Sequence, residues 1–140
     1  MRYLLDTNVI SELRKRHGVA DRNVVEWASG QDADHLFISV ISVMEIELGI
    51  RLVERRDHAQ GVVLRTWFER AVLEDLVDRI LPVSLDIALR TAALHVPNPR
   101  PERDAYIAAT ALSHGLTVVT RNIADFESTG VRLFNPWQEK

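Results

Sequence analysis

Short apolar runs alternate along the chain with longer segments of helical periodicity. The apolar runs predict strands at residues 2–5, 36–39, 80–83, 116–120 and 131–134. Between them, apolar positions recur every three or four residues and predict helices at about 6–13, 24–29, 43–50, 57–76, 85–94 and 103–114. Because the strands are apolar on both faces and alternate with helices, the pattern predicts a three-layer α/β/α sandwich with a mostly parallel central sheet.

One segment interrupts this pattern. Three prolines lie between Val96 and Pro101, and a helix cannot continue through them, so we expect a loop there. The sequence contains no internal repeat, low-complexity tract or Gly/Ser linker. A chain of 140 residues can bury a full hydrophobic core. We therefore expect residues 1–140 to form a single domain.

The composition is that of an ordered globular protein, with 46% hydrophobic and 26% charged residues. No apolar run approaches the roughly 18 residues of a membrane span, and Asp6 comes too early for a signal peptide. Cysteine is absent, which excludes disulfides and thiolate metal sites. We expect a prokaryotic cytoplasmic protein that does not associate with membranes.

The net charge of −3 argues against nucleic-acid binding through bulk positive charge. It does not exclude an enzyme that holds a metal with carboxylates and meets phosphates locally. Basic residues cluster at 14–16, at 51 with 55–56, and at 100 with 103, and we interpret these first as solvated helix faces.

Acidic and amide side chains follow the predicted strands or begin the helices after them. Asp6 follows the first strand, and Glu45 lies near the start of the helix after the second. Asp104 lies in the first turn after the proline loop, while Asn122 and Asp125 follow the fourth strand. In parallel sheets the ligand crevice lies beyond the carboxyl ends of the strands. The sequence therefore predicts that these residues share one crevice.

Clustered carboxylates repel each other and any incoming phosphate unless a cation is present. Mg²⁺ takes hard oxygen ligands and usually keeps several waters, so a few carboxylates suffice to bind it. Bound metal can activate water and stabilise the oxygens of an in-line phosphodiester displacement. The cluster thus indicates a metal site for phosphate chemistry.

Each acid also has a purely structural interpretation. Asp6 fits a helix N-cap, and Ser42 to Glu45 fits a capping box. Asn122 to Asp125 has nearly the same layout, and Asp104 suits a helix N-terminus. Spacing alone leaves these interpretations open.

Five local motifs, in order and over nearly the whole chain, resemble those of PIN-domain proteins. They are Leu4–Ile10 (LLDTNVI), Ser39–Gly49 (SVISVMEIELG), Asp104–Ala111 (DAYIAATA), Val119–Phe126 (VTRNIADF) and Phe134–Trp137 (FNPW). The last looks like the C-terminal tail of a VapC/FitB-type branch.

The resemblance implies a PIN domain with metal-dependent endoribonuclease activity, usually the toxin of a type II toxin–antitoxin pair and usually a homodimer. It implies Mg²⁺, with Mn²⁺ as a substitute, held directly by Asp6 and Asp104, with Glu45 supporting the metal or a water. Asn122 would be a polar orienter and Asp125 an outer acid. The implied partners are an RNA substrate and a cognate antitoxin that blocks the acidic crevice.

Several neighbouring residues are also candidates for a role at this crevice. Glu47 lies about 200° around the helix from Glu45, so we assign it no site role. Thr7 and Asn8 could hydrogen-bond within the site or cap the helix. Arg100, Arg103 and Arg121 are candidate phosphate contacts or merely solvated side chains, and Trp27, Trp67, Phe68 and Trp137 are expected in the core or an interface.

Two other functions compete with the nuclease. A Mg²⁺-dependent phosphohydrolase on a similar sheet would want a second acid two residues after Asp6, where this chain has Asn8, and a phosphoryl-receiver domain would want a late lysine where it has Arg121. A non-catalytic PIN-like module that binds RNA or protein should have lost the acids that this chain retains.

Overall fold

A five-stranded parallel sheet forms the centre of the protein in the computed structural model, which describes residues 1–138. Its strands are β1 (Tyr3–Leu5), β2 (Leu36–Ser39), β3 (Ile80–Leu81), β4 (Thr117–Val119) and β5 (Leu133–Phe134). They lie in the order β3-β2-β1-β4-β5, and every neighbouring pair is parallel. The predicted α/β/α sandwich is confirmed, and β1 lies at its middle.

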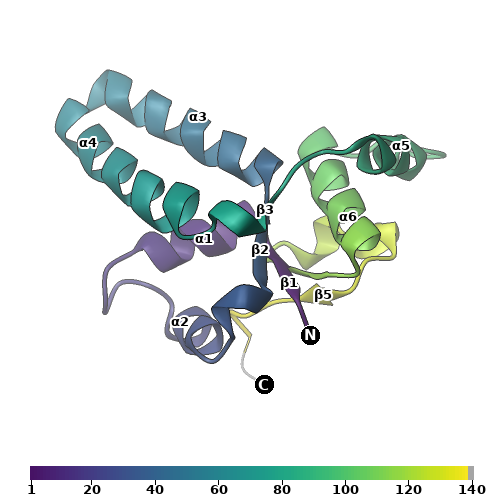
Figure 1. The fold of residues 1–140 in the computed structure, drawn as a ribbon, viewed down its shortest axis with the longest axis horizontal. Coiled ribbons are helices and arrows are strands. Elements are labelled where there is room, and N and C mark those ends of the chain that lie inside the picture. The colour runs from purple at the N-terminus through teal and green to yellow at the C-terminus, as the bar shows by residue number, and fades with distance from the viewer. Residues whose placement is uncertain (139–140) are drawn as a thin grey trace.

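Six α-helices, all within residues 1–138, cover the two faces of this sheet. They are α1 (Thr7–Arg14), α2 (Arg22–Ser29), α3 (Val40–Arg56), α4 (His58–Trp67), α5 (Leu85–Leu94) and α6 (Glu102–His114). Figure 1 shows α1 to α4 on one side of the strands and α5 with α6 on the other. Each helix lies where the apolar periodicity predicts one.

Alternating side chains of the strands supply two separate cores. Leu4 and Val118 pack with α6, while Leu5 and Val119 pack with the helices of the opposite face. Successive side chains of a strand point to opposite faces, so two consecutive apolar residues serve both layers. The continuous apolar runs of the sequence are therefore explained by burial of both faces.

The predicted helix over residues 57–76 changes its winding partway. After α4 the chain continues as a wider π-type turn over Phe68–Glu74 and then a short 3-10 turn over Val77–Arg79. Phe68 and Val72, which belong to this segment, are almost fully buried. The change of winding accompanies the burial of these two apolar side chains and leads the chain into β3.

The helix after β2 begins earlier than the proposed capping box requires. α3 starts at Val40, and its N-cap is Ser39, whose hydroxyl accepts from the amide N–H of Ile41 at 3.0 Å. Ser42 lies inside the helix with a buried hydroxyl that has no partner in residues 1–138. The capping-box interpretation of Glu45 is wrong, because the cap belongs to the strand end itself.

α3 and α4 form an antiparallel pair that is joined by ion pairs between their side chains. Arg65 of α4 donates to both Glu47 and Glu54 of α3, and Arg51 also donates to Glu47. These contacts hold the pKa of Glu47 below its usual range, chiefly through Arg65. Glu47 therefore has a structural role, as its position on the helix predicts.

The proline-rich loop leads into α6 and is held by Arg100. The Arg100 side chain donates to the Leu94 carbonyl at 2.7 Å and to the Ser128 hydroxyl at 2.9 Å. α6 then ends at Gly115, which takes the left-handed conformation, φ 66°, that glycine favours at this position. None of the helices formed by residues 1–138 combines the length and apolar character needed to cross a lipid bilayer.

Candidate metal centre

Asp6 is both the N-cap of α1 and the acid at the end of the central strand. Its Oδ1 accepts from the amide N–H of Thr7 at 2.8 Å, so the capping interpretation is correct for this oxygen. Its own amide donates to the carbonyl of Val119 at 2.9 Å, which ties it to the neighbouring strand. The side chain is only 7% exposed. Capping thus leaves Oδ2 to be held by other groups.

Thr120, at the carboxyl end of β4, holds that second oxygen. Its hydroxyl donates to Asp6 Oδ2 at 2.8 Å, and Asn8 Nδ2 approaches the same oxygen at 3.3 Å. The amide of Asn122 donates back to the Thr120 hydroxyl at 3.0 Å. Sequence reasoning gave Thr120 no role, although a hydroxyl at the end of a buried strand was the available signal. Asn8 does hydrogen-bond within the site.

Glu45 reaches the site from the second turn of α3. Its Oε1 accepts from the Thr7 hydroxyl at 2.9 Å, and its Oε2 lies 3.6 Å from Arg103. Thr7 therefore connects the cap of α1 to Glu45 and fixes one carboxylate oxygen. The other oxygen meets a cation that is half exposed, so the charge of Glu45 is only partly offset at the cleft.

Asp104, in the first turn of α6, is less restrained than Asp6 and Glu45. None of the hydrogen bonds or ion pairs within residues 1–138 involves its carboxylate. Burial, together with the negative charges of Asp6, Asp125 and Glu45, raises the pKa of Asp104 to about 6, and burial is the largest of these causes. The helix N-terminus alone would lower this pKa. The four acids therefore act as one electrostatic group.

Burial also raises the pKa of Asp6 above its ordinary value. The hydrogen bonds from Thr120 and the Thr7 amide oppose this shift, and the charges of Glu45 and Asp125 add to it. Two carboxyl groups with raised pKa values at one sheet edge mark a place where negative charge is uncompensated. Such clusters are typical of functional sites.

Asn122 and Asp125 lie at opposite sides of a short 3-10 turn, Ile123–Asp125. Asn122 lines the same cleft as Asp6, Glu45 and Asp104, and its side chain makes no capping hydrogen bond. Asp125 is exposed and lines an adjoining hollow. Its negative charge raises the pKa of Asp104 in the cleft. The structure thus brings four of the five predicted residues into one cleft and places the fifth beside it.

The cleft itself is a shallow hollow of about 470 Å³ at the carboxyl edge of the sheet. Three basic residues, Arg14, Lys15 and Arg121, line it together with the acids. Lys15 is paired with Glu12 at 2.9 Å. Arg103 meets Glu45, whereas Arg100 is committed to the proline loop. Of the three arginines proposed as phosphate contacts, two therefore lie at the acidic group.

The chemistry of the donors fits a hard divalent cation. No group of three His, Cys, Asp or Glu side chains within residues 1–138 is placed so that it could hold an ion by itself. Mg²⁺ is usually bound by one or two carboxylates, with waters and substrate phosphates completing its octahedron. Asp6 and Asp104 can supply those two carboxylates, and a cation there would offset the like charges that add to the raised pKa of each.

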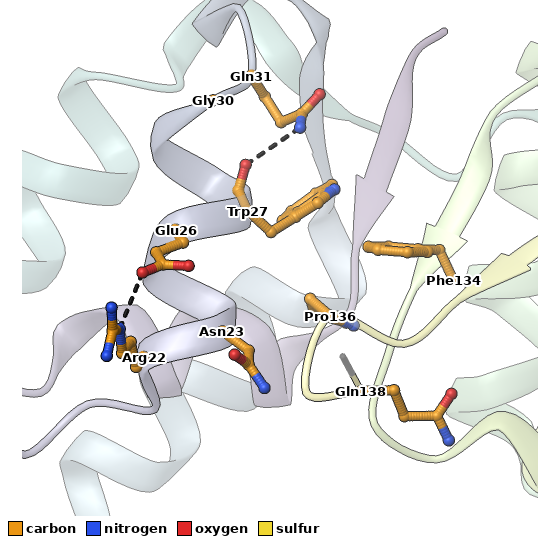
Figure 2. Close-up of a pocket in the computed structure, with 9 residues that line it drawn as sticks. All are labelled: Arg22, Asn23, Glu26, Trp27, Gly30, Gln31, Phe134, Pro136 and Gln138. Atoms are coloured by element: carbon orange, nitrogen blue, oxygen red, sulfur yellow. Dashed lines mark hydrogen bonds and ion pairs between the residues drawn. The ribbon is translucent and has the colours of Figure 1, made fainter. Parts of the chain in front are cut away.

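A larger hollow between α2 and the C-terminal tail lacks this chemistry. Figure 2 shows its aromatic floor, Trp27 and Phe134, with amide side chains around it. The one carboxylate that residues 1–138 contribute to its lining, that of Glu26, is paired with Arg22 at 2.9 Å. Trp27 also packs against Tyr3 with ring centroids 5.1 Å apart, so its core assignment is confirmed. The smaller acidic cleft is the better candidate for an active site.

Comparison with known proteins gives a consistent result. A family model described as PIN domain matches residues 3–131. The chain is 36% identical to the VapC ribonuclease Y4jK of Sinorhizobium fredii, over 96% of this chain and 97% of the relative. It is also 36% identical to toxin FitB of Neisseria gonorrhoeae, over 97% and 99%.

Solved structures agree with these sequence relatives. The structure of FitAB bound to an IR36 DNA fragment contains a chain that matches with TM-score 0.88 and 33% identity, over 99% of this chain and 97% of that one. FitAcB from Neisseria gonorrhoeae matches with TM-score 0.87 and 35% identity, over 98% and 99%.

Proposed function

The chain belongs to the PIN-domain family, and on that basis we propose that it is a metal-dependent endoribonuclease, the toxin of a toxin–antitoxin pair. One observation carries the catalytic part of this proposal. Asp6 and Asp104 line one cleft at the carboxyl edge of the sheet with raised pKa values, and Glu45 adds a third negative charge. Acids that disfavour one another's ionisation suit a site that binds a divalent cation and then a phosphodiester.

Each acid has a distinct part in the proposed reaction. Asp6, held at both oxygens, provides a fixed ligand for Mg²⁺ or Mn²⁺, and Asp104, without a hydrogen-bond partner in residues 1–138, can turn to complete the site. A bound divalent metal supplies acidified water and neutralisation of charge on the phosphate oxygens. Glu45 would support the metal or a water through Oε2, because its Oε1 accepts the hydrogen bond from the Thr7 hydroxyl. Asn122 orients polar groups at the cleft wall, and Asp125 tunes the charge from outside.

The rival enzyme classes lack support in this geometry. Asn8 occupies the position where a phosphohydrolase would need its second acid, and its amide is engaged with Asp6 and Thr120. A module that only binds RNA or protein could use Asp6 as the cap of α1, but it would have no use for Glu45 and Asp104 in the same cleft, where the charge of Glu45 raises the pKa of Asp104. The nuclease accounts for both features.

We also propose that the protein acts in the cytoplasm as a homodimer and that a cognate antitoxin occupies the acidic cleft.

The dimer would use an apolar stripe on α3. Val40, Met44, Leu48 and Leu52 recur every four residues and are 38 to 55% exposed. Residues at this spacing share one face of a helix, and a second copy could cover the stripe. A basic side chain of the antitoxin would neutralise the acids.

Cleavage of a mixed RNA pool by the purified protein tests the catalytic proposal. Reactions contain Mg²⁺, Mn²⁺ or EDTA, and Asp6→Asn and Asp104→Asn are compared with Glu47→Gln as the matched acid-to-amide control. We expect cleavage that requires metal, fails in both aspartate variants and persists in the control. Equal cleavage by the wild type and the aspartate variants, or cleavage in EDTA, would overturn the assignment.

A further inference from the structure

The C-terminal tail places an aromatic ring against a basic residue of the acidic cleft. The guanidinium carbon of Arg121 lies 5.3 Å from the ring centroid of Trp137, within the range of a cation–π contact. Both residues line the cleft that holds Asp6 and Asp104. Arg121 directly follows Thr120, so the contact joins the hydrogen-bonded strand end to the tail.

Trp137 is fixed from two sides. Its amide donates to Asn135 Oδ1 at 2.9 Å, and its carbonyl accepts from Asn23 Nδ2 of α2 at 2.9 Å. Pro136, which precedes it, is buried. Figure 2 shows Asn23 on α2 facing the tail near Pro136. These hydrogen bonds hold the backbone of Trp137, and its side chain packs against the core formed with α1 to α4, so the ring can serve as a platform for Arg121.

The guanidinium of Arg121 keeps its donors available. The Arg121 amide donates to Asn8 Oδ1 at 3.4 Å, which holds the backbone, whereas no ion pair within residues 1–138 includes its side chain. Two other basic residues near the acids differ in this respect, since Lys15 is paired with Glu12 and Arg103 with Glu45. Arg14, which also lines the cleft, makes no ion pair within residues 1–138, but no aromatic ring of these residues lies under its guanidinium as Trp137 lies under that of Arg121. Stacking on an aromatic face leaves the planar edge of a guanidinium free for a bidentate contact with phosphate.

We infer that Arg121 binds a backbone phosphate of the RNA beside the cleavage position and that Trp137 is a positioning residue that aims it. This inference rests on the proposed function. A phosphate that enters a cleft with several carboxylates needs a cation on the approach side. Among the basic residues of 1–138 that line the cleft, Arg121 is the one that combines a side chain without an ion pair with an aromatic ring to hold it. The contact is to phosphate, so it is independent of base identity.

Steady-state cleavage by the full chain tests this inference with Arg121→Ala, Arg121→Lys, Trp137→Leu and Trp137→Phe. Arg90→Ala is the control, because Arg90 pairs with Asp86 on α5 away from the cleft. We expect Arg121→Ala to raise KM by about ten-fold, as the loss of a charged hydrogen bond does, with a smaller change in kcat. Trp137→Leu should raise KM in the same direction, Trp137→Phe should restore it, and Arg121→Lys should recover only part of it.

Binding of a labelled RNA in EDTA separates the possible failures. The logarithm of the affinity should fall less steeply with the logarithm of the salt concentration in Arg121→Ala, by a slope of about 0.7, as for one lost phosphate contact. If the wild type cleaves RNA while Arg121→Ala keeps its KM and salt slope, the inference is wrong and the function stands. If the wild type neither binds nor cleaves RNA, the proposed function fails. Thermal melting of each variant identifies a rise in KM that comes only from misfolding.

Discussion

The hydroxyl of Thr120 donates a 2.8 Å hydrogen bond to Oδ2 of Asp6, between residues 114 positions apart in the sequence. The two residues follow neighbouring strands, β4 and β1, which pair in parallel. With the Thr7 amide on Oδ1, this contact holds both oxygens of Asp6. The orientation of the central acid therefore depends on a residue that carries no charge.

Replacing Thr120 by valine should impair the site while preserving the shape of the side chain. The change removes the hydroxyl that donates to Asp6 Oδ2 and accepts from the backbone N–H of Asn122. We expect a loss of about 1–3 kcal/mol in the free energy of unfolding, because buried polar groups lose their partner. We expect metal affinity to fall by at least about ten-fold, as for other residues that orient ligands. Chemical denaturation and metal titration measure the two effects. Thr120→Ser keeps the hydroxyl and should behave like the wild type; equal losses in both variants would contradict this account.

Cleavage should depend on pH through Asp104. Its pKa is raised to about 6, and only the ionised carboxylate can bind metal. At low Mg²⁺, kcat/KM should therefore rise as pH increases through about 6 and level off above it. Because protons and metal compete for the same oxygens, more Mg²⁺ should move the midpoint to lower pH. A rate that is constant from pH 5 to pH 8 at every metal concentration would show that this carboxylate is not needed in its charged form.

The same substitution at two acids of α3 should affect activity in one case and stability in the other. Glu45→Gln removes a charge from the cleft and should lower the cleavage rate by at least about ten-fold. Glu47→Gln weakens the contact with Arg65 and should cost about 0.5–1 kcal/mol of stability, as for a partly exposed ion pair, with cleavage unchanged. Cleavage rates and denaturation midpoints of both variants check this pair. The reverse pattern would exchange the roles of the two residues.

The fold was largely predictable because its signals are local. The apolar run Leu116–Thr120 needs burial on both faces, and Gly115 marks a helix end that any context would require. The acids were predictable because parallel strands bring their carboxyl ends to one edge. The winding change at Phe68 and the early start of α3 were not, because both depend on packing against distant residues rather than on local spacing.

The supporting contacts of the site were also beyond sequence reasoning. Thr120 looks like any residue at the end of a buried strand until β4 is known to lie beside β1. Trp137 and Arg121 are 16 positions apart, and nothing in their spacing predicts that the tail returns to the cleft. Such contacts depend on the strand order, which local pattern does not specify.

Two helical glycines should give opposite results when changed to alanine. A Cβ at Gly61 of α4 would lie 2.5 Å from Cγ and 3.0 Å from Cα of Glu54, so the two helices would have to separate. We expect Gly61→Ala to destabilise the protein by about 1–3 kcal/mol, as overpacking does. A Cβ at Gly49 of α3 meets nothing within 4 Å, so Gly49→Ala should stabilise by about 0.5–1 kcal/mol through helix propensity. Thermal unfolding of both variants measures the difference, and a stabilising Gly61→Ala would mean that the helices are less closely packed.

Asp104→Asn should stabilise the metal-free protein at neutral pH. The pKa of Asp104 is about 6 in the folded state against 3.8 ordinarily, so between these values the folded state binds more protons than the unfolded state. The ionisation of Asp104 therefore lowers the free energy of unfolding, fully at pH values above about 6 and not at all below about pH 4. Allowing for solvent screening, we expect the variant to gain about 1–2 kcal/mol at pH 7.5 and less at pH 4.5.

Metal should reverse this order, since a ligand that binds only the folded state stabilises it in proportion to RT ln(1 + [L]/Kd). In EDTA the variant should melt at the higher temperature, and at saturating Mg²⁺ or Mn²⁺ the wild type should. Asp86→Asn is the control, because contacts with Ser113 and Arg90 lower the pKa of Asp86, so its replacement should destabilise at pH 7.5 with or without metal. If metal raises the melting temperatures of the wild type and Asp104→Asn equally, Asp104 is not a ligand, and the raised pKa reflects burial and like charge alone.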